Sequence, residues 1–84
     1  MNSKHKKVLK SIFTNPIPSS IQSKDIEKLL IAVGCIVSEG RGSRVRFKKN
    51  NIFAIFHRPH PKKETDKGAV LSVRDYLTKI GEAP

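Results

Sequence analysis

The fold is decided by the stretch that runs from residue 44 to residue 56, RVRFKKNNIFAIF. In an extended chain alternate residues share a side, so Val45 and Phe47 face one way. Arg44 and Arg46 then face the other way. Two asparagines follow, and asparagine accepts the positive φ values of tight turns. The pattern predicts a β-hairpin, with a strand over 44–47, a turn over 49–51 and a strand over 52–56.

The segments around the hairpin carry apolar residues at the spacing of helices. Ser23 is a good N-cap residue, and Gly34 and Gly81 are typical C-terminal stops. The predicted elements are a helix over about 3–13 capped by Ser3, a helix from Ser23 to Gly34, a strand over 35–38, a turn over 39–42, a loop over 57–66 and a helix from Thr65 or Asp66 to Gly81. The predicted buried stripes are Val8, Leu9, Ile12 and Phe13; Ile26, Leu29, Leu30 and Val33; and Val70, Val73, Tyr76, Leu77 and Ile80.

These elements predict an α+β fold, in which a three-stranded antiparallel sheet packs against helices in the order (α)-α-β-β-β-α. Without the first helix this is the element order of double-stranded-RNA-binding domains. A chain of 84 residues suffices for one compact domain, 1–84, and for no more. We expect 1–16 to form a helical extension and 23–81 to form an RNA-binding-like core.

The single cysteine bears on the cellular compartment. Cys35 cannot form an internal disulfide, and its apolar neighbours indicate a buried thiol, which agrees with a reducing compartment. No apolar run approaches the roughly 20 residues of a membrane span. The basic start of the chain is followed by an apolar segment that Lys10 interrupts, unlike a signal peptide. We therefore expect a cytoplasmic protein without a membrane partner.

Charge is the strongest feature of the composition. Seventeen Lys and Arg residues against seven Asp and Glu residues give a formal net charge of +10 at pH 7. Such a charge favours an anionic partner, either a nucleic acid or an acidic protein. No acidic residue occurs between Gly40 and Lys63, and the glycines of 40–43 let backbone amides approach a phosphate. The candidate RNA-binding residues are Arg41, Gly42, Ser43, Arg46, Lys48, Arg58, Lys62 and Lys63; the alternative is a solvated charged surface that binds nothing specific.

The segment from His57 to Pro61, which reads HRPHP, contains residue types that are suited to catalysis. RNA carries its own nucleophile, the 2′-hydroxyl, so cleavage needs a base for that proton, an acid for the leaving 5′-oxygen and positive charge for the phosphorane. Histidine suits both proton transfers because a free imidazole titrates at about pH 6.5. His57 and His60 are therefore candidate catalytic residues, with Arg44, Arg58 or Lys62 supplying charge. The alternatives are a half-buried structural role for His57 and plain solvent exposure for His60.

A metal-dependent site is not supported by the same segment. The two histidines supply two ligands, the only nearby carboxylate is Glu64, and cations crowd the position. We therefore predict no metal and no cofactor.

Two motifs resemble the HicA toxin family. They are GRGSRVRF at 40–47 and FHRPHP at 56–61, followed by a helix that opens at Lys67-Gly68. The resemblance covers about 23–81, and the first helix is similar to an extension found in one branch of the family. It implies a double-stranded-RNA-binding-like fold, the toxin role in a type II toxin–antitoxin system and metal-independent cleavage of messenger RNA. It also implies a cognate HicB antitoxin that covers the active face.

One position departs from the family. The usual catalytic histidine follows Gly-Ser in the hairpin, and here that position is Arg44. An arginine stays protonated near neutral pH, so it cannot act as the base, although it can bind the scissile phosphate. His60 matches the second His-Pro element of the family, and His57 is an additional histidine that could take the missing proton role. Two function classes follow: an endoribonuclease toxin, or a non-catalytic module that clamps RNA through its basic hairpin.

Overall fold

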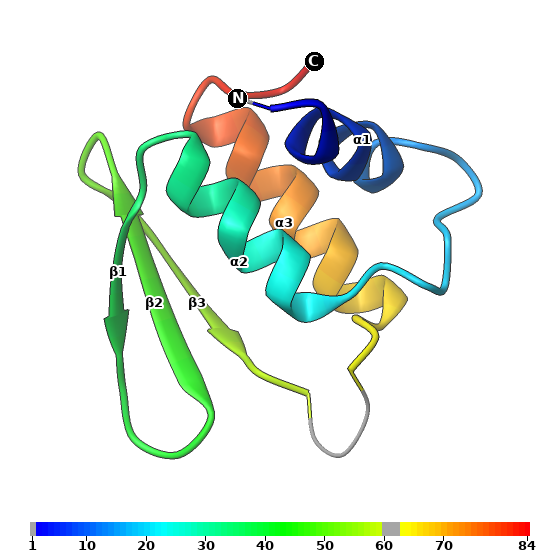
Figure 1. Cartoon of the computed structure of the whole chain (residues 1–84). Helices are drawn as coiled ribbons and strands as arrows, with labels where there is room; N and C mark the ends of the chain where they lie inside the picture. Colours follow the sequence, from blue (N-terminus) through cyan, green and yellow to red (C-terminus); the bar gives the residue numbers. More distant parts are fainter. Residues whose placement is uncertain (1, 60–62) are drawn as a thin grey trace.

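The computed structural model of the chain describes residues 2–59 and 63–84. Within these residues, three helices and three strands follow one another in the predicted order (Figure 1). They are α1 (Ser3–Ile12), α2 (Ser23–Ala32), β1 (Ile36–Glu39), β2 (Arg44–Lys49), β3 (Ile52–His57) and α3 (Lys67–Lys79).

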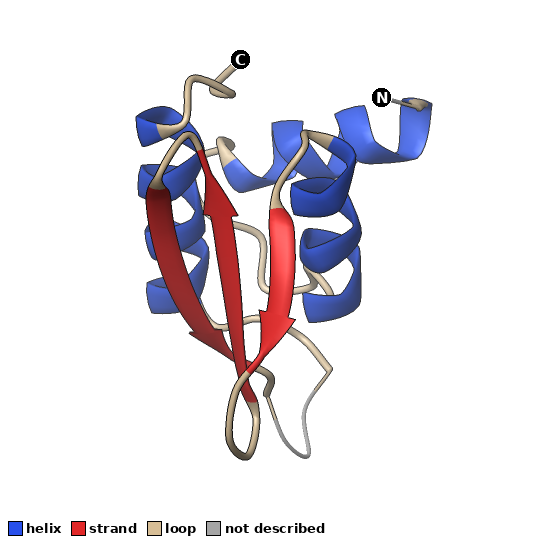
Figure 2. Ribbon diagram, turned by 90° about the vertical axis from the view of Figure 1, so that its left-hand side faces the viewer, coloured by secondary structure: helices blue, strands red, loops and turns tan. Residues whose placement is uncertain are grey.

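The sheet is antiparallel, with β2 in the centre and β1 and β3 at its edges. Helices α2 and α3 cover one face of the sheet, and the other face is open (Figure 2). Helix α1 contacts α2 and α3 on the side of the helical layer away from the sheet (Figure 1). The predicted α+β fold, a three-stranded antiparallel sheet packed against helices, is confirmed.

One apolar core joins the sheet to the helices. Val45 and Phe47 of β2 are each 1% exposed, and Ile12 of α1 is fully buried in the same cluster. Every residue of the predicted stripes on the second and third helices is buried, and those of the first are buried or partly buried against this core. Cys35 is the buried thiol that its neighbours predict. The apolar periodicity therefore identified the core-facing side of each helix.

The start of α1 differs from the prediction by one residue. Asn2 caps this helix instead of Ser3, because its side chain accepts a hydrogen bond from the His5 N–H at 2.8 Å. The start of α3 is as predicted: Asp66 caps it, accepting a hydrogen bond from the Ala69 N–H at 2.7 Å.

The predicted N-cap of α2 is also one residue off. Gln22 precedes the helix, and Ser23 is its first residue. Backbone pairing explains the shift: Gln22 forms a bridge with Glu64, and the Ser23 N–H donates to the Lys63 carbonyl at 3.0 Å. This pairing holds Gln22 extended and makes Ser23 the first helical residue.

The strand bounds differ slightly as well. Cys35 belongs to the turn that follows α2 and closes it. Its N–H donates to the Leu30 carbonyl at 3.0 Å, and Gly34 takes a φ of 101°. The first strand therefore begins one residue later than predicted. The hairpin strands run further, through Lys49 and His57. The turn between them has both asparagines at positive φ, as predicted.

Helix α1 is tied to α3 by one arginine. The Arg74 guanidinium donates from Nε to the Ile12 carbonyl at 2.9 Å and from its other nitrogens to the Thr14 carbonyl at 3.2 Å and the Asn15 side chain at 3.3 Å. Its central carbon lies 5.7 Å from the centre of the Phe13 ring. These bonds satisfy carbonyls that the end of a helix leaves without partners.

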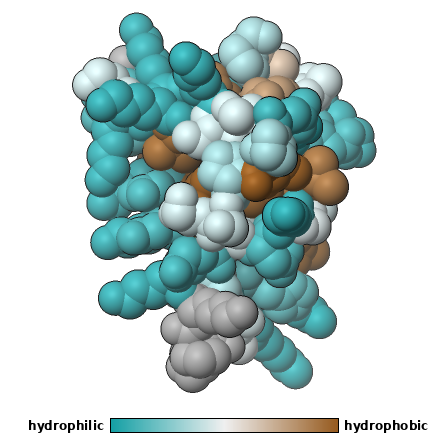
Figure 3. Space-filling view, turned by 90° about the vertical axis from the view of Figure 1, so that its right-hand side faces the viewer, coloured by the Kyte–Doolittle hydropathy of each residue, from teal (hydrophilic) through white to brown (hydrophobic). Residues whose placement is uncertain are grey.

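The face on the α1 side is basic. Hydrophilic side chains cover much of it (Figure 3). Helix α1 contributes four exposed lysines, of which Lys4 lies 3.6 Å from an Asp25 carboxylate oxygen; they are Lys4, Lys6, Lys7 and Lys10. The net charge is therefore spread around the molecule and does not by itself locate a binding site.

The Tyr76 hydroxyl joins α3 to β3 at the edge of the core. It donates to the Ile52 carbonyl at 2.9 Å and lies 4.0 Å from the Cys35 Sγ. Burial raises the pKa of Tyr76 to about 12, and the neighbouring Cys35 adds to this shift. Burial also raises the pKa of the Cys35 thiol.

Replacing Tyr76 with phenylalanine should lower the free energy of unfolding by about 1–2 kcal/mol at pH 7, because the Ile52 carbonyl loses its donor. In the folded chain the phenol keeps its proton up to a pH of about 12, whereas in the unfolded chain it loses it at about 10. This part of the stability is therefore present below pH 10 and is lost as the pH rises toward 12. Urea unfolding of both proteins at pH 7 and pH 11 checks this, and an equal loss of stability with pH would contradict it.

Candidate nucleic-acid interface

The open sheet face is formed by alternate residues of the three strands. Arg44, Arg46 and Lys48 of β2 point to it, because Val45 and Phe47 between them point into the core. Alternate residues of a strand are about 6.8 Å apart, so the three cations form a line. Each cation is the β2 member of a cross-strand row; the rows are Arg44 with His57, Ser38 with Arg46 and Ile55, and Ile36 with Lys48 and Phe53.

His57 lies directly opposite Arg44. The Arg58 N–H donates to the Ser43 carbonyl at 2.8 Å, so Arg44 and His57 form the adjacent, non-hydrogen-bonded pair of the ladder. In antiparallel sheets such pairs bring side chains closest together. Both side chains are on exposed residues, so the half-buried role for His57 is wrong. The structure thus brings His57 and Arg44 together on the open sheet face.

Three large apolar side chains share the open sheet face with these cations. Ile36 is 70% exposed, Phe53 is 51% exposed and Ile55 is 58% exposed. The central carbon of the Arg46 guanidinium lies 5.1 Å from the centre of the Phe53 ring, and Lys48 Nζ lies 5.3 Å from it. At these distances the cations are attracted to the ring.

Sequence reasoning missed this apolar patch. Both sides of β3 are apolar, so its pattern alone does not say which side is buried. The usable signal is pairing: once Arg46 is placed outward, its partner Ile55 must also face outward, and Phe53, two residues away, must follow.

A shallow hollow of about 310 Å³ adjoins the patch at the turn between β1 and β2. It is lined by Ser38, Glu39, Gly40, Arg41, Arg44, Arg46 and Ile55. The Gly40 N–H donates to the Arg44 carbonyl at 2.9 Å, so this amide is not free for a phosphate as the glycine-rich turn had suggested. Gly42, with a φ of 64°, remains open to solvent. Anionic and apolar groups can both be accommodated in this hollow.

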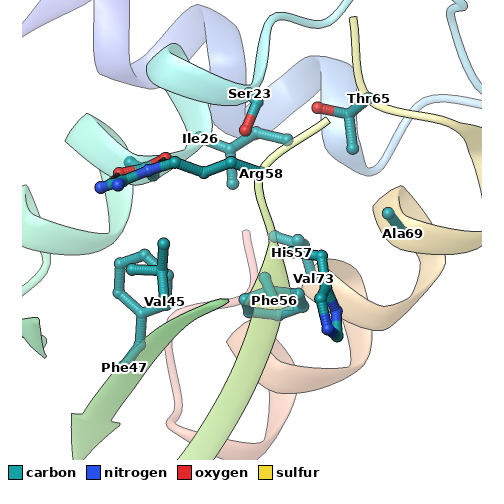
Figure 4. Close-up of a pocket in the computed structure, with 11 residues that line it drawn as sticks. Ser23, Ile26, Val45, Phe47, Phe56, His57, Arg58, Thr65, Ala69 and Val73 are labelled. Carbon is teal, nitrogen blue, oxygen red and sulfur yellow. Dashed lines mark hydrogen bonds and ion pairs between the residues drawn. The ribbon is translucent and has the colours of Figure 1, made fainter. Parts of the chain in front are cut away.

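Arg58 turns away from the open sheet face. Its Nε and Nη2 each donate to a carboxylate oxygen of Glu27 at 3.0 Å, and Nη1 donates to Glu39 at 2.6 Å. In Figure 4 its guanidinium extends toward α2, away from the His57 ring. The hydrogen bonds that Arg58 donates to Glu27, and then the one that it donates to Glu39, raise the pKa of Arg58 above its ordinary value. Its charge is balanced within the protein, and its predicted role in RNA binding stays a prediction.

The cavity beneath Arg58 is too small for a ligand. It lies between α2, the sheet and α3 and holds about 50 Å³ (Figure 4). Its lining includes the apolar side chains of Ile26, Val45, Phe56 and Val73. Small-molecule sites usually exceed about 300 Å³, so we assign this cavity to the core.

The remaining predicted residues lie outside this cluster. His60 and Lys62 fall outside the described residues, and Lys63 is exposed beside the start of α2. Within 2–59 and 63–84, no three His, Cys, Asp or Glu side chains gather in an arrangement that could hold a metal ion. None of the helices in this described part is long and apolar enough to cross a bilayer.

Comparison with known proteins relates the chain to a protein family. The sequence model of a protein family described as "HicA toxin of bacterial toxin-antitoxin" matches residues 23–81. No curated protein and no solved structure matches the chain significantly. The matched segment contains α2, the whole sheet and α3, and it excludes α1.

Replacing Arg58 with lysine should lower the melting temperature, because lysine cannot present the parallel N–H groups that Glu27 accepts. The difference in melting temperature between the unmodified protein and Arg58→Lys should be smaller at high salt, because salt screens the attraction between the charges at this position. Arg41→Lys is the matched control, since Arg41 makes no ion pair with any residue that the structure describes. Thermal melts of the three proteins at low and high salt test this, and an unchanged Arg58→Lys melt would show that these ion pairs add nothing to stability.

Proposed function

Because the chain belongs to the HicA toxin family, we propose that it is a metal-independent endoribonuclease that cuts messenger RNA in the cytoplasm. Membership of the family makes it the toxin of a toxin–antitoxin system, with an antitoxin as its partner. The observation that carries the proposed activity is the direct pairing of His57 with Arg44 on the open sheet face.

The proposed reaction uses the 2′-hydroxyl of the RNA as nucleophile. A base removes its proton, the 2′-oxygen bonds to the adjacent phosphorus, and the bond from phosphorus to the 5′-oxygen breaks. An acid gives a proton to that leaving oxygen, so the products carry a 2′,3′-cyclic phosphate and a 5′-hydroxyl. Each well-placed proton-transfer group contributes about 10²- to 10⁴-fold in rate. Positive charge stabilises the phosphorane that forms on the way.

We assign these tasks to three residues. Arg44 stands at the position of the usual family histidine and binds the scissile phosphate, since it cannot act as a base. His57 makes one proton transfer, because the Cβ atoms of directly paired residues lie about 5 Å apart and one phosphate can contact both side chains. His60, in the second His-Pro element, makes the other.

The other predicted residues bind flanking phosphates or position the site. Arg46 and Lys48 extend the line of cations from Arg44, and the turn with Arg41, Gly42 and Ser43 adjoins it. Lys62 and Lys63 follow His60 and can continue the basic surface.

Arg58 is a positioning residue, because its ion pairs hold the end of the strand that carries His57.

The antitoxin is proposed to be of the HicB type and to cover the open sheet face. A net charge of +10 favours an acidic partner, and exposed apolar side chains are common where proteins meet.

Purified protein should cut end-labelled RNA in the presence of EDTA, leaving 5′-hydroxyl ends. His57→Ala and His60→Ala should each lower the rate by about 10²- to 10⁴-fold, because each removes a proton-transfer group. His5→Ala is the matched control, since it removes a histidine of α1 and should leave the rate unchanged. A full rate in both active-site variants would contradict the histidine mechanism, and inhibition by EDTA would contradict metal independence.

Arg44 favours a second function, a non-catalytic module that clamps RNA. A clamp would bind RNA in a salt-sensitive way without cutting it. Arg44→His would then place the usual family histidine beside His57 and should produce cleavage in the same assay. Cleavage by the unmodified protein would exclude the clamp, whatever the effect of Arg44→His.

A further inference from the structure

We propose that the open sheet face binds an unpaired RNA strand, with a base stacked on Phe53 and the neighbouring phosphates held by the cations of β2. This inference rests on the proposed function, and it names the form of RNA that the site takes.

The apolar patch is the first reason. Phe53 and Ile55 are neighbours on the same side of β3, and Ile36 lies in the row that contains Phe53. All three are at least half exposed. Leaving such surface in water is unfavourable, and contiguous exposed apolar side chains mark binding sites. A nucleobase has a flat apolar face that stacks on an aromatic ring whatever the base.

The arrangement of charge favours RNA over a protein partner. Lys48 is the direct cross-strand partner of Phe53, Arg46 is its diagonal neighbour, and Arg44 continues the line toward the turn between β1 and β2. None of these three forms an ion pair with a carboxylate of the described residues. Their spacing of about 6.8 Å is comparable to that of successive phosphates in an extended nucleotide chain. Cations and an aromatic ring within a few ångströms of each other fit a ligand in which phosphates and planar rings alternate.

The same patch argues against a duplex. In an RNA duplex each base is covered on both faces by its neighbours, and proteins contact phosphates and 2′-hydroxyls instead. A duplex would present its charged phosphate backbone to the exposed side chains of Ile36, Phe53 and Ile55. These side chains would then bury no apolar surface against a base. An unpaired strand exposes its bases, so a base can stack on the Phe53 ring while the neighbouring phosphates contact the cations of β2.

Binding of a ten-nucleotide 2′-O-methyl oligouridine tests the inference, because this strand lacks the hydroxyl nucleophile and cannot be cut. The same strand annealed to a 2′-O-methyl complement is the duplex probe. Phe53→Leu keeps an apolar side chain and removes the ring, so it should weaken single-strand binding roughly fivefold or more. Its salt dependence should match the unmodified protein, whereas Arg46→Gln should reduce the slope by about 0.7. Ile31→Leu changes an exposed apolar residue of α2 and is the matched control.

A tryptophan at position 53 gives a second readout. The chain contains no tryptophan, so Phe53→Trp introduces a single fluorophore at the proposed stacking position. This variant should bind the single strand as tightly as the unmodified protein, and its fluorescence should be quenched by the strand and little by the duplex.

Equal binding by Phe53→Leu, or duplex binding as tight as single-strand binding, would overturn the inference. The apolar patch would then be assigned to the proposed antitoxin alone. Cleavage that depends on His57 but not on Phe53 would leave the proposed function standing without the inference. Stacking without cleavage would leave the inference standing without the proposed catalysis.

Discussion

Strand β2 has to fill the core with one side and carry cations on the other. Val45 and Phe47 are almost completely buried, and the arginines between and before them are exposed. A slip of one residue would turn guanidinium groups into the core, where an unpaired charge is very costly. Because β2 pairs on both edges, its register also determines where β1 and β3 place their side chains. The positions of His57 and Phe53 therefore follow from core packing.

The distribution of carboxylates complements this constraint. Within residues 2–59 and 63–84, five of the seven acidic residues form ion pairs: Asp25 with Lys4, Asp75 with Lys79, Glu82 with Lys49, and Glu27 and Glu39 with Arg58. Among the described residues, none of these pairs includes a cation that faces outward from β2. Lys49, which faces the helices, donates to the Val33 carbonyl at the end of α2 and pairs with Glu82. The acidic residues thus stabilise the framework and leave the open sheet face positive.

Local patterns in the sequence predict most of the fold. Alternation in residues 44–47 and helical spacing elsewhere identify the buried side of β2 and of the three helices, because these periods reflect backbone geometry. What they miss depends on contacts between distant segments. The partners of Arg58 lie 19 and 31 positions away, and Ser23 loses its capping role to a backbone bond with Lys63. The outward placement of Phe53 likewise requires the pairing, because the sequence of β3 is apolar on both sides.

The candidate site divides in the same way. Motif and charge single out Arg44, Arg46 and His57, and the sheet brings them to one face. The motifs do not show that His57 and Arg44 are direct neighbours, because their pairing depends on the length of the hairpin turn. The role of His60 remains a prediction from its motif.

The hydrogen bonds of Arg74 hold α1 against the rest of the protein independently of the covalent chain. The segment between α1 and α2 is exposed at Ser19 and Ser20, where a protease can reach it. A cut there removes the covalent link but leaves Ile12 in the core and the three Arg74 hydrogen bonds in place. The nicked molecule would then behave as a two-fragment complex, whose integrity depends on concentration. By the same reasoning, a synthetic peptide of residues 2–18 would serve to reconstitute a chain that lacks its first helix.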